Sequence, residues 1–177
     1  MIITLTGDPS SGKSYIARTI AQKLGLTQYS VGDLRRKEAQ KRGLTIAEFN
    51  ALDEDTDTMF DEQQKQLGLK EDNFVIDGRL SWHFIPHSFK IFVTASEDVR
   101  AQRMLEQDEG HERIGEDAQD LLEAKKLMQE RIKSDIERYK KFYGIDPYDL
   151  SHYDLVLDTS NLSKEESVKQ VLDAIKR

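Results

Sequence analysis

A phosphate-binding motif near the start of the chain constrains its fold more than any other feature. Residues 7–14 read GDPSSGKS, which matches the pattern G-x-x-x-x-G-K-[ST]. The glycines let the backbone aim its N–H groups at an anion, Lys13 adds a charge for the outer phosphates, and the Ser14 hydroxyl suits Mg²⁺. Residues 1–6 predict a strand before this loop, and residues 14–24, closed by Gly25, predict a helix after it. The order of strand, loop and helix predicts a nucleotide phosphate site.

The overall composition narrows the class of protein. A chain of 177 residues is the size of one domain, and the absence of cysteine excludes disulfides and thiolate metal sites. A formal net charge of −7 opposes general binding to nucleic acid, whose phosphates carry the same sign. No apolar run approaches the roughly 20 residues that span a bilayer. We therefore expect a soluble cytoplasmic protein with neither nucleic-acid nor membrane partners.

Short apolar runs alternate with helical patterns along the rest of the chain. Further strands are predicted at residues 27–30, 73–77, 89–94 and 153–158. A polar helix is predicted from Gly32 to about Arg42, and a short one begins at the Thr45–Glu48 capping box. Acidic residues 53–57 lead into a helix that ends near Gly68, and Ser96 caps a helix that runs to about Gln107. A long helix is predicted from about Asp117 to Phe142, and a last one begins after Ser163. Five strands alternating with helices predict a three-layer α/β domain with a parallel sheet, whose ligands bind at the carboxyl ends of the strands.

Charged residues collect at these predicted strand ends. Asp77 ends an apolar strand as a Walker-B acid does, where it would hold Mg²⁺ through water, and the alternative is a helix cap or a solvated loop residue. Arg79 follows Gly78 at the same strand end, where it is placed to pair with a phosphate through two hydrogen bonds unless it is a surface arginine. For Arg36, after the second strand, a phosphate contact and a surface position are equally open.

The long predicted helix carries three charged residues on one face. Arg131, Asp135 and Arg138 are separated by four and then three residues, which brings their side chains together. This face is a candidate second anion site, and a solvated ion pair is the alternative.

A polar segment at residues 108–116 precedes this helix and has the pattern of a mobile flap. Arg103 and Arg113 lie beside or within it. Arginines on a flap could neutralise charge on a transferring phosphoryl group, or they are ordinary surface charges.

With these features the chain resembles the nucleoside monophosphate kinases, and most closely the short, archaeal type of cytidylate kinase. The similarity runs almost from end to end. It includes the phosphate loop, residues 30–36 (SVGDLRR), residues 74–80 (FVIDGRL) and the spacing of the three charged residues on the long helix. The most distinctive stretch is residues 138–163, with RY, YGID, DLS, YDLVLDTS and LS in sequence. Generic P-loop proteins lack that stretch, so it separates this family from the superfamily.

The resemblance implies a single domain over residues 1–177 with a sheet of order 2-3-1-4-5. It also implies a monophosphate-binding segment at about residues 31–68 and an arginine-bearing lid at about residues 104–130. The implied donor is ATP with Mg²⁺, and the implied acceptor is CMP or dCMP. The expected partners are therefore small-molecule nucleotides, and the expected state is a monomer.

Residue roles carry over from the family position by position. The implied ATP-binding residues are Gly7, Asp8, Pro9, Ser10, Ser11, Gly12, Lys13, Ser14 and Tyr15. The implied substrate-binding residues are Ser30, Gly32, Asp33, Arg36, Gly78, Arg79, Arg131, Asp135 and Arg138. The implied catalytic residues are Lys13, Arg79 and Arg131, the implied lid arginines are Arg103 and Arg113, and the implied Mg²⁺ contacts are Ser14 and, through water, Asp77.

Three departures from the family pattern bear on these roles. Asp8 and Ser10 occupy loop positions where small residues or glycine are more frequent, and an inward-facing Asp8 would weaken ATP binding. Residues 107–108 stand where a lid arginine is common, so that role passes to one of the two lid arginines named above. Leu80 replaces the aspartate that helps to read the base in longer bacterial cytidylate kinases, so base specificity does not carry over.

Two alternatives stay open at this point. The acceptor could be AMP, UMP or a deoxynucleoside monophosphate, because the base is not determined. The protein could instead be a non-kinase P-loop regulator that binds ATP and acts on a partner, although such a switch has no need of a second arginine-lined site. Phosphoryl transfer requires alignment and charge neutralisation rather than a general base, since the acceptor phosphate is itself the nucleophile.

Overall fold

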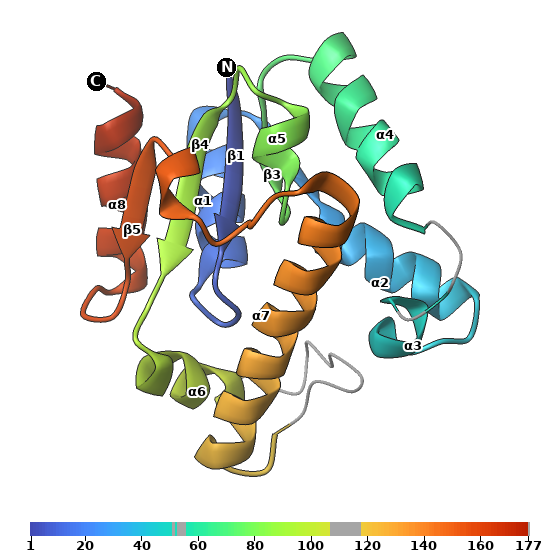
Figure 1. The fold of residues 1–177 in the computed structure, drawn as a ribbon. Helices are drawn as coiled ribbons and strands as arrows, with labels where there is room; N and C mark the ends of the chain where they lie inside the picture. Colours follow the sequence, from blue (N-terminus) through green and yellow to red (C-terminus); the bar gives the residue numbers. More distant parts are fainter. Residues whose placement is uncertain (51, 53–55, 107–117, 177) are drawn as a thin grey trace.

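A five-stranded parallel sheet organises the molecule (Figure 1). The computed structural model describes residues 1–50, 52, 56–106 and 118–176. The strands are β1 (Ile2–Gly7), β2 (Thr27–Ser30), β3 (Phe74–Asp77), β4 (Phe89–Thr94) and β5 (Leu155–Asp158). Their order is β2-β3-β1-β4-β5, and every pair is parallel. The predicted order 2-3-1-4-5 is therefore confirmed.

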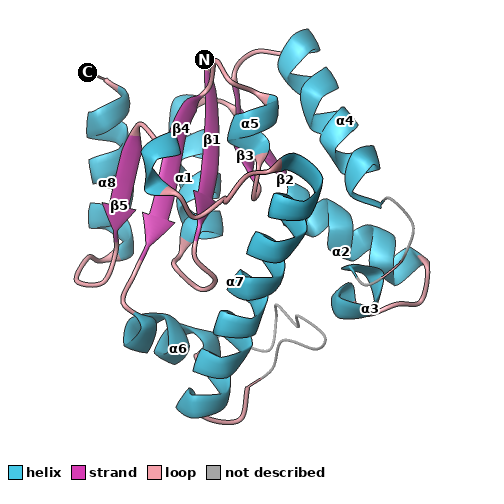
Figure 2. Cartoon of the chain, viewed as in Figure 1, coloured by secondary structure: helices cyan, strands magenta, loops and turns pink. Residues whose placement is uncertain are grey.

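Helices connect the strands as the alternating pattern predicts. They are α1 (Lys13–Leu24), α2 (Val31–Lys41), α3 (Ile46–Asn50), α4 (Thr56–Lys70), α5 (Ser81–Phe84), α6 (Glu97–Leu105), α7 (Leu121–Tyr143) and α8 (Lys164–Ile175), with a 3₁₀ helix, η2 (Leu150–His152). Helices α1 and α8 cover one face of the sheet, while α5 and the chain that follows α7 cross the other (Figure 2). The domain thus has the predicted three layers.

Each strand of the centre sends side chains into both faces. Ile3 and Leu5 of β1 are buried against α1 and α8, in a cluster that includes Ile16. Ile2 points to the opposite face, where it packs with Ile76 of β3. This alternation follows from the two-residue period of a strand. Full burial of such a side chain contributes about 1.5–3 kcal/mol, so the two clusters together hold the layers around the sheet.

The segment between β2 and β3 has an apolar cluster of its own. Ala39, Phe49 and Phe60 bring α2, α3 and α4 together. The buried Arg35 guanidinium lies over the rings of Phe49 and Phe60, at 5.5 and 5.2 Å from their centroids. These three helices therefore form a unit beside the main sheet, on the right of Figure 1.

The predicted helix caps at Thr45, Ser96 and Ser163 are confirmed. Ser163 and Glu166 form a complete capping box at the start of α8. Thr45 and Glu48 exchange the same two hydrogen bonds before α3. Ser96 Oγ accepts from the backbone N–H of Val99 at the start of α6.

Three helix boundaries differ from the prediction. Helix α7 begins at Leu121, because Asp120 caps it by accepting from Glu123 N at 2.9 Å. Helix α6 ends at Leu105. Helix α4 ends at Lys70, two residues beyond the predicted end near Gly68. Neither α5 nor η2 is predicted, because elements of three or four residues are too short to show a period.

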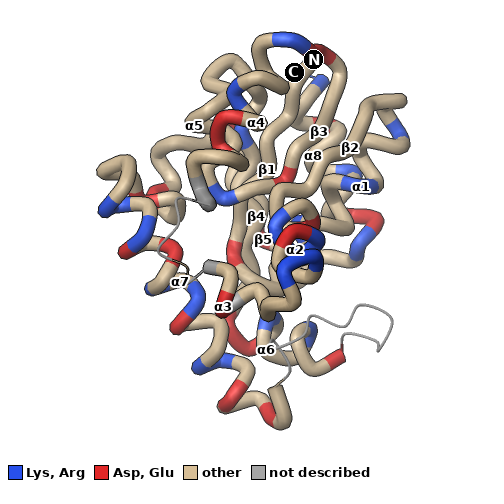
Figure 3. Tube along the Cα trace, turned by 90° about the vertical axis from the view of Figure 1, so that its right-hand side faces the viewer, with Lys and Arg blue, Asp and Glu red and all other residues tan. Residues whose placement is uncertain are grey.

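Charge is distributed over the helices with both signs mixed. Figure 3 shows Lys and Arg interspersed with Asp and Glu along α7 and around α2. Among the helices that the structure describes, none is both long and apolar enough to cross a membrane.

Candidate functional site

The phosphate loop connects the end of β1 to the start of α1 at the carboxyl edge of the sheet. Its backbone takes left-handed angles at Ser10 (φ 60°) and Gly12 (φ 90°). A Cβ on Gly7 would lie 2.2 Å from the carbonyl oxygen of Val93, which excludes any larger residue. The backbone N–H of Asp8 donates to that same carbonyl at 3.0 Å. The loop is thus held against β4 with the positive end of α1 beside it, an arrangement suited to phosphate groups.

Lys13 and Asp77 face each other at the loop. Nζ of Lys13 is 3.6 Å from Oδ2 of Asp77, because β3 is the neighbour of β1 and both strands end at this edge. Asp77 is only 2% exposed. Among the described residues, none donates a hydrogen bond to its Oδ2 atom. A buried carboxylate oxygen beside Lys13, the residue before Ser14, fits Mg²⁺ held through water and argues against a simple cap or solvated residue.

Side chains from β4 and α6 also fix the loop. Thr94 Oγ1 donates to Asp8 Oδ2 at 2.6 Å, so the carboxylate of Asp8 is directed at the end of β4. Arg103 of α6 donates to the Ser11 carbonyl at 3.3 Å and to Thr159 Oγ1 at 2.9 Å. Burial lowers the pKa of this guanidinium, and nearby carboxylates offset only part of the shift. Arg103 therefore contacts the phosphate loop at the Ser11 backbone.

The predicted lid is only partly within the described part of the chain. Arg113 and residues 107–108 lie outside it, as does the polar segment 108–116. Arg103 is described, and its contacts are those just given. Its lid role stays a prediction.

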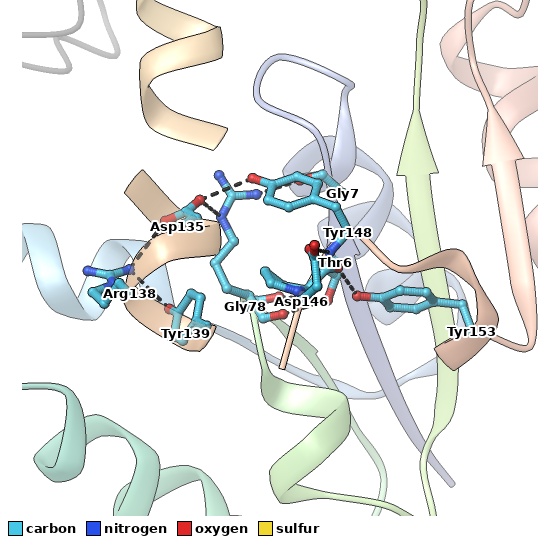
Figure 4. A network of polar contacts seen from close by, with 11 residues as sticks. Thr6, Gly7, Gly78, Asp135, Arg138, Tyr139, Asp146, Tyr148 and Tyr153 are labelled. Atoms are coloured by element: carbon cyan, nitrogen blue, oxygen red, sulfur yellow. Dashed lines mark hydrogen bonds and ion pairs between the residues drawn. The ribbon is translucent and has the colours of Figure 1, made fainter. Parts of the chain in front are cut away.

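Arg79 lies at the junction of the phosphate loop and α7, with 14% of its side chain exposed. Figure 4 shows its partners Gly7, Asp135 and Tyr148. Its Nη1 donates to the carbonyl of Gly7 at 2.5 Å, and its Nε lies 2.8 Å from Asp135 Oδ2. The guanidinium carbon lies 5.7 Å from the ring centroid of Tyr148. Burial lowers the pKa of Arg79, but the charge of Asp135 and the neighbouring tyrosines more than compensate, so the net shift is upward. The surface-arginine alternative is therefore wrong.

Asp135 is the centre of this charge cluster and is 7% exposed. Besides Arg79, it accepts from Arg138 Nη2 at 3.2 Å and from the Tyr148 hydroxyl at 3.1 Å. Arg138 Nη2 also lies 3.1 Å from the Tyr139 hydroxyl. The shared face predicted for α7 is thus a buried cluster rather than a solvated ion pair.

Arg131 lies one turn before Asp135 on α7, and its charge acts on the same cluster. Burial raises the pKa of the Tyr148 phenol, and the positive charges of Arg79 and Arg131 offset only part of that rise. The charge of Arg131 therefore acts on Tyr148, whose hydroxyl is bonded to Asp135.

The residues after β2 form a compact group of their own. Ser30 caps α2 by accepting from the backbone N–H of Asp33 at 3.3 Å. Arg36 Nη2 lies 2.5 Å from Asp33 Oδ1. A Cβ on Gly32 would lie 3.4 Å from the same guanidinium, so Arg36 lies over the Gly32 backbone. The structure thus pairs Arg36 with Asp33 in the first turns of α2.

Two more predicted residues have clear positions. A Cβ on Gly78 would lie 2.2 Å from Ser81 Oγ and 2.9 Å from Val31 Cγ2, so only glycine fits there. Tyr15, on the outer side of α1, has the ammonium group of Lys164 at 5.3 Å from its ring centroid.

Sequence reasoning missed Tyr148 and could not place Leu80. Tyr148 comes from the chain between α7 and β5, inside the distinctive stretch 138–163, but no residue spacing connects it to Asp135. Leu80 is 2% exposed and packs with Ile76 and Trp82 in the core. It therefore offers no polar group to a base.

The sheet order and the loop after its central strand define a P-loop kinase fold. Shikimate kinase from Bacteroides thetaiotaomicron has a similar structure, with a TM-score of 0.64 at 17% identity over 100% of this chain and 99% of that one. At this identity the likeness shows the fold alone.

Sequence comparison identifies the family within this class. Residues 2–161 match the model of the "Cytidylate kinase-like family". A cytidylate kinase of Archaeoglobus fulgidus is 35% identical over 99% of this chain and 94% of its own length. Another, of Methanocella arvoryzae, is 38% identical over 90% and 88%. The chain therefore belongs to the cytidylate kinase-like family, and among the P-loop kinases it is a nucleoside monophosphate kinase, a transferase.

Proposed function

We propose that this protein transfers the γ-phosphoryl group of ATP to CMP or dCMP by direct in-line displacement, forming the diphosphate. The position of Arg79 is the observation that carries the proposal. Its guanidinium is hydrogen-bonded to the carbonyl of Gly7 and ion-paired with Asp135 of α7. A buried cation between the two nucleotide sites offsets the repulsion of two phosphate groups that are brought together.

In this proposal the donor is bound by residues 7–15. Backbone N–H groups of the loop surround the phosphates, and Lys13 neutralises the outer ones. Ser14, and Asp77 through water, would hold Mg²⁺, which when bound neutralises charge on the phosphate oxygens. The buried Oδ2 of Asp77, 3.6 Å from Lys13 Nζ, supports this assignment.

The acceptor phosphate is assigned to arginines on three elements. Arg36 approaches from α2, Arg131 from α7 and Arg79 from the end of β3. The bonds of Arg79 to Gly7 and Asp135 use Nη1 and Nε and fix the plane of the group, and Nη2 would donate to the acceptor phosphate.

The remaining assignments complete the acceptor site. Asp135 and Arg138 are assigned to the sugar or phosphate. The segment at about residues 31–68 would enclose the monophosphate, with Ser30, Gly32, Asp33 and Gly78 forming its backbone wall. The lid at about residues 104–130 would close over both nucleotides.

These groups account for the chemistry without a general base. The acceptor phosphate is anionic and attacks directly, so the protein's task is alignment and charge neutralisation. Closure over the site would exclude water, which otherwise accepts the phosphoryl group in place of the nucleotide.

A substrate panel tests the proposal. ADP release is measured with ATP, Mg²⁺ and each of CMP, dCMP, UMP, AMP and GMP. We expect the highest kcat/KM with CMP or dCMP. Preference for AMP, UMP or GMP would assign another acceptor, and absence of ADP with every monophosphate would overturn the kinase proposal in favour of an ATP-binding regulator.

The Lys13→Ala variant controls for contaminating kinases in this panel. We expect turnover to fall by orders of magnitude, because Lys13 provides the charge for the transferring group, while the circular dichroism spectrum stays that of the wild type. Near-normal activity of Lys13→Ala would show that the donor site is misassigned.

A further inference from the structure

A buried polar cluster beside the acceptor site has no role in the chemistry described above. It consists of Asp61 and Gln64 of α4, Ser81 of α5 and Tyr143 of α7, and is called the Asp61 cluster here. Asp61 is 7% exposed, and Gln64 and Ser81 are buried with it. Carboxylates are rarely buried unless they are paired or hydrogen-bonded, because desolvation of the charge costs free energy.

Hydrogen bonds fix the orientation of every group in the Asp61 cluster. Gln64 Nε2 donates to the Phe60 carbonyl at 3.2 Å and to Asp61 Oδ1 at 3.3 Å. Ser81 Oγ donates to Gln64 Oε1 at 2.6 Å, which sets the direction of the amide. The Tyr143 hydroxyl donates to Asp61 Oδ2. Both oxygens of Asp61 therefore act as acceptors held in one position.

The cluster adjoins the acceptor side of the site through β3 and α2. A Cβ on Gly78 would be 3.4 Å from Gln64 Oε1 and 2.9 Å from Val31 Cγ2. Gly78 directly precedes Arg79, and Val31 directly precedes Gly32, over which Arg36 lies. The Asp61 cluster is thus next to the residues assigned to the acceptor phosphate.

Helix α7 shows in which direction the cluster lies. Asp135, Tyr139 and Tyr143 are spaced by four residues and so follow one another along one face of the helix. Tyr139 contacts Arg138 near Asp135, and Tyr143 contacts Asp61. The two ends of this row are about 12 Å apart along the helix axis. That span suits a nucleotide with its phosphate near Asp135 and its base near Asp61.

We propose that Asp61 determines the base specificity of the acceptor site by accepting a hydrogen bond from an exocyclic amino group. Each carboxylate oxygen has two lone pairs, so an oxygen bonded to the protein can accept a second donor. The 4-amino group of cytosine is such a donor and pairs with Asp or Glu, whereas the 4-oxo group of uracil is an acceptor. This proposal rests on the proposed function and names the feature of the acceptor that the site reads.

The Asp61→Asn variant tests the proposal through a ratio of activities. We expect wild-type protein to prefer CMP over UMP. In Asp61→Asn, kcat/KM for CMP should fall about 10- to 100-fold, as for the loss of a hydrogen bond to a charged group. The asparagine amide can donate to the 4-oxo group of uracil, so kcat/KM for UMP should rise. The ratio of kcat/KM for CMP to kcat/KM for UMP should therefore fall by a larger factor than kcat/KM for CMP does.

Glu62→Gln is the matched control. It makes the same change of charge at the next position of α4, where the side chain is exposed. Glu62→Gln should leave the CMP/UMP ratio unchanged. A folded Asp61→Asn protein with the wild-type ratio would overturn the proposal while leaving kinase activity established. Wild-type protein that phosphorylates no monophosphate would instead overturn the proposed function itself.

A second measurement tests the proposal even if the Asp61→Asn protein does not fold. Wild-type protein is assayed with the 2-pyrimidone analogue of CMP, which lacks only the 4-amino group. We expect kcat/KM to fall about 10- to 100-fold relative to CMP, for the same reason. Equal kcat/KM for CMP and the analogue would overturn the proposal without any change to the protein.

Discussion

At the scale of single residues, the Arg79–Asp135 pair is the most consequential contact of the site. Both side chains are largely shielded from water, at 14% and 10% exposed, and each supplies the polar partner that water would otherwise provide. Arg138 and Tyr148 also contact Asp135, so the carboxylate stays in a network if one partner moves. The pair therefore has a structural role in addition to the proposed contact of Arg79 with the acceptor phosphate.

The variants Arg79→Ala and Arg131→Ala separate these two roles. Both should raise KM for the acceptor far more than KM for ATP, because both residues are assigned to the acceptor phosphate. Only Arg79→Ala should also lose stability, on the order of 3 kcal/mol, since it breaks a buried ion pair. Steady-state kinetics and urea unfolding measure the two effects.

The opposite patterns have clear meanings. A change confined to KM for ATP would contradict the placement of both arginines. An equal loss of stability in Arg131→Ala would show that the two residues share one structural role.

At the scale of elements, α4 shows how tertiary packing overrides a local signal. Glycine disfavours a helix interior and the sequence predicts an end near Gly68, yet α4 continues to Lys70. A Cβ at Gly68 would lie 2.9 Å from Ile85 Cγ1, and Ile85 is fully buried. Glycine at this position thus allows α4 to approach the core.

Gly68→Ala should therefore destabilise the protein although alanine is the better helix former. The gain in helix propensity is about 1 kcal/mol, whereas overpacking a buried β-branched side chain costs about 1–3 kcal/mol. Urea unfolding should show a net loss on the order of 1 kcal/mol. Gln63→Ala, at an exposed position of α4, should change stability by less than about 0.5 kcal/mol. A stabilised Gly68→Ala protein would mean that the Ile85 side chain moves away from the added methyl group at little cost in free energy.

The elements that the sequence predicts well are those with strong local signals. The five strands, the phosphate loop and the capped starts of α6 and α8 all have such signals. The family resemblance added the strand order, which local patterns do not contain. Helix α5 was missed because its four residues are too few to show a helical period.

The candidate site divides in the same way. Asp77 ends β3, Arg79 lies two residues beyond it, and Lys13 closes the loop after β1, so their meeting at the sheet edge is predictable from a parallel fold. Tyr148 and Asp61 reach their partners only through the packing of α7 against distant segments. No spacing in the sequence encodes such contacts, and they became visible only in the structure.

At the scale of the whole molecule, two nucleotide sites should respond separately to ligands. We expect a thermal shift with ATP and, independently, with CMP. A ligand at 100 times its Kd adds about 2.7 kcal/mol of stability, and each kcal/mol raises Tm by about 2–4 °C for a domain of this size. Differential scanning fluorimetry measures both shifts. Stabilisation by ATP but not by CMP at any concentration would contradict a preformed acceptor site.

The hydrogen bond from Arg79 to the Gly7 carbonyl has a thermodynamic consequence as well. It joins the backbone of the loop assigned to ATP to a side chain assigned to the second nucleotide. If binding of one nucleotide shifts the Arg79 guanidinium, the conformation of the loop that binds the other nucleotide changes with it. Thermodynamic linkage requires the resulting change in binding free energy to be equal in both directions. The factor by which bound ATP changes the affinity for CMP therefore equals the factor by which bound CMP changes the affinity for ATP.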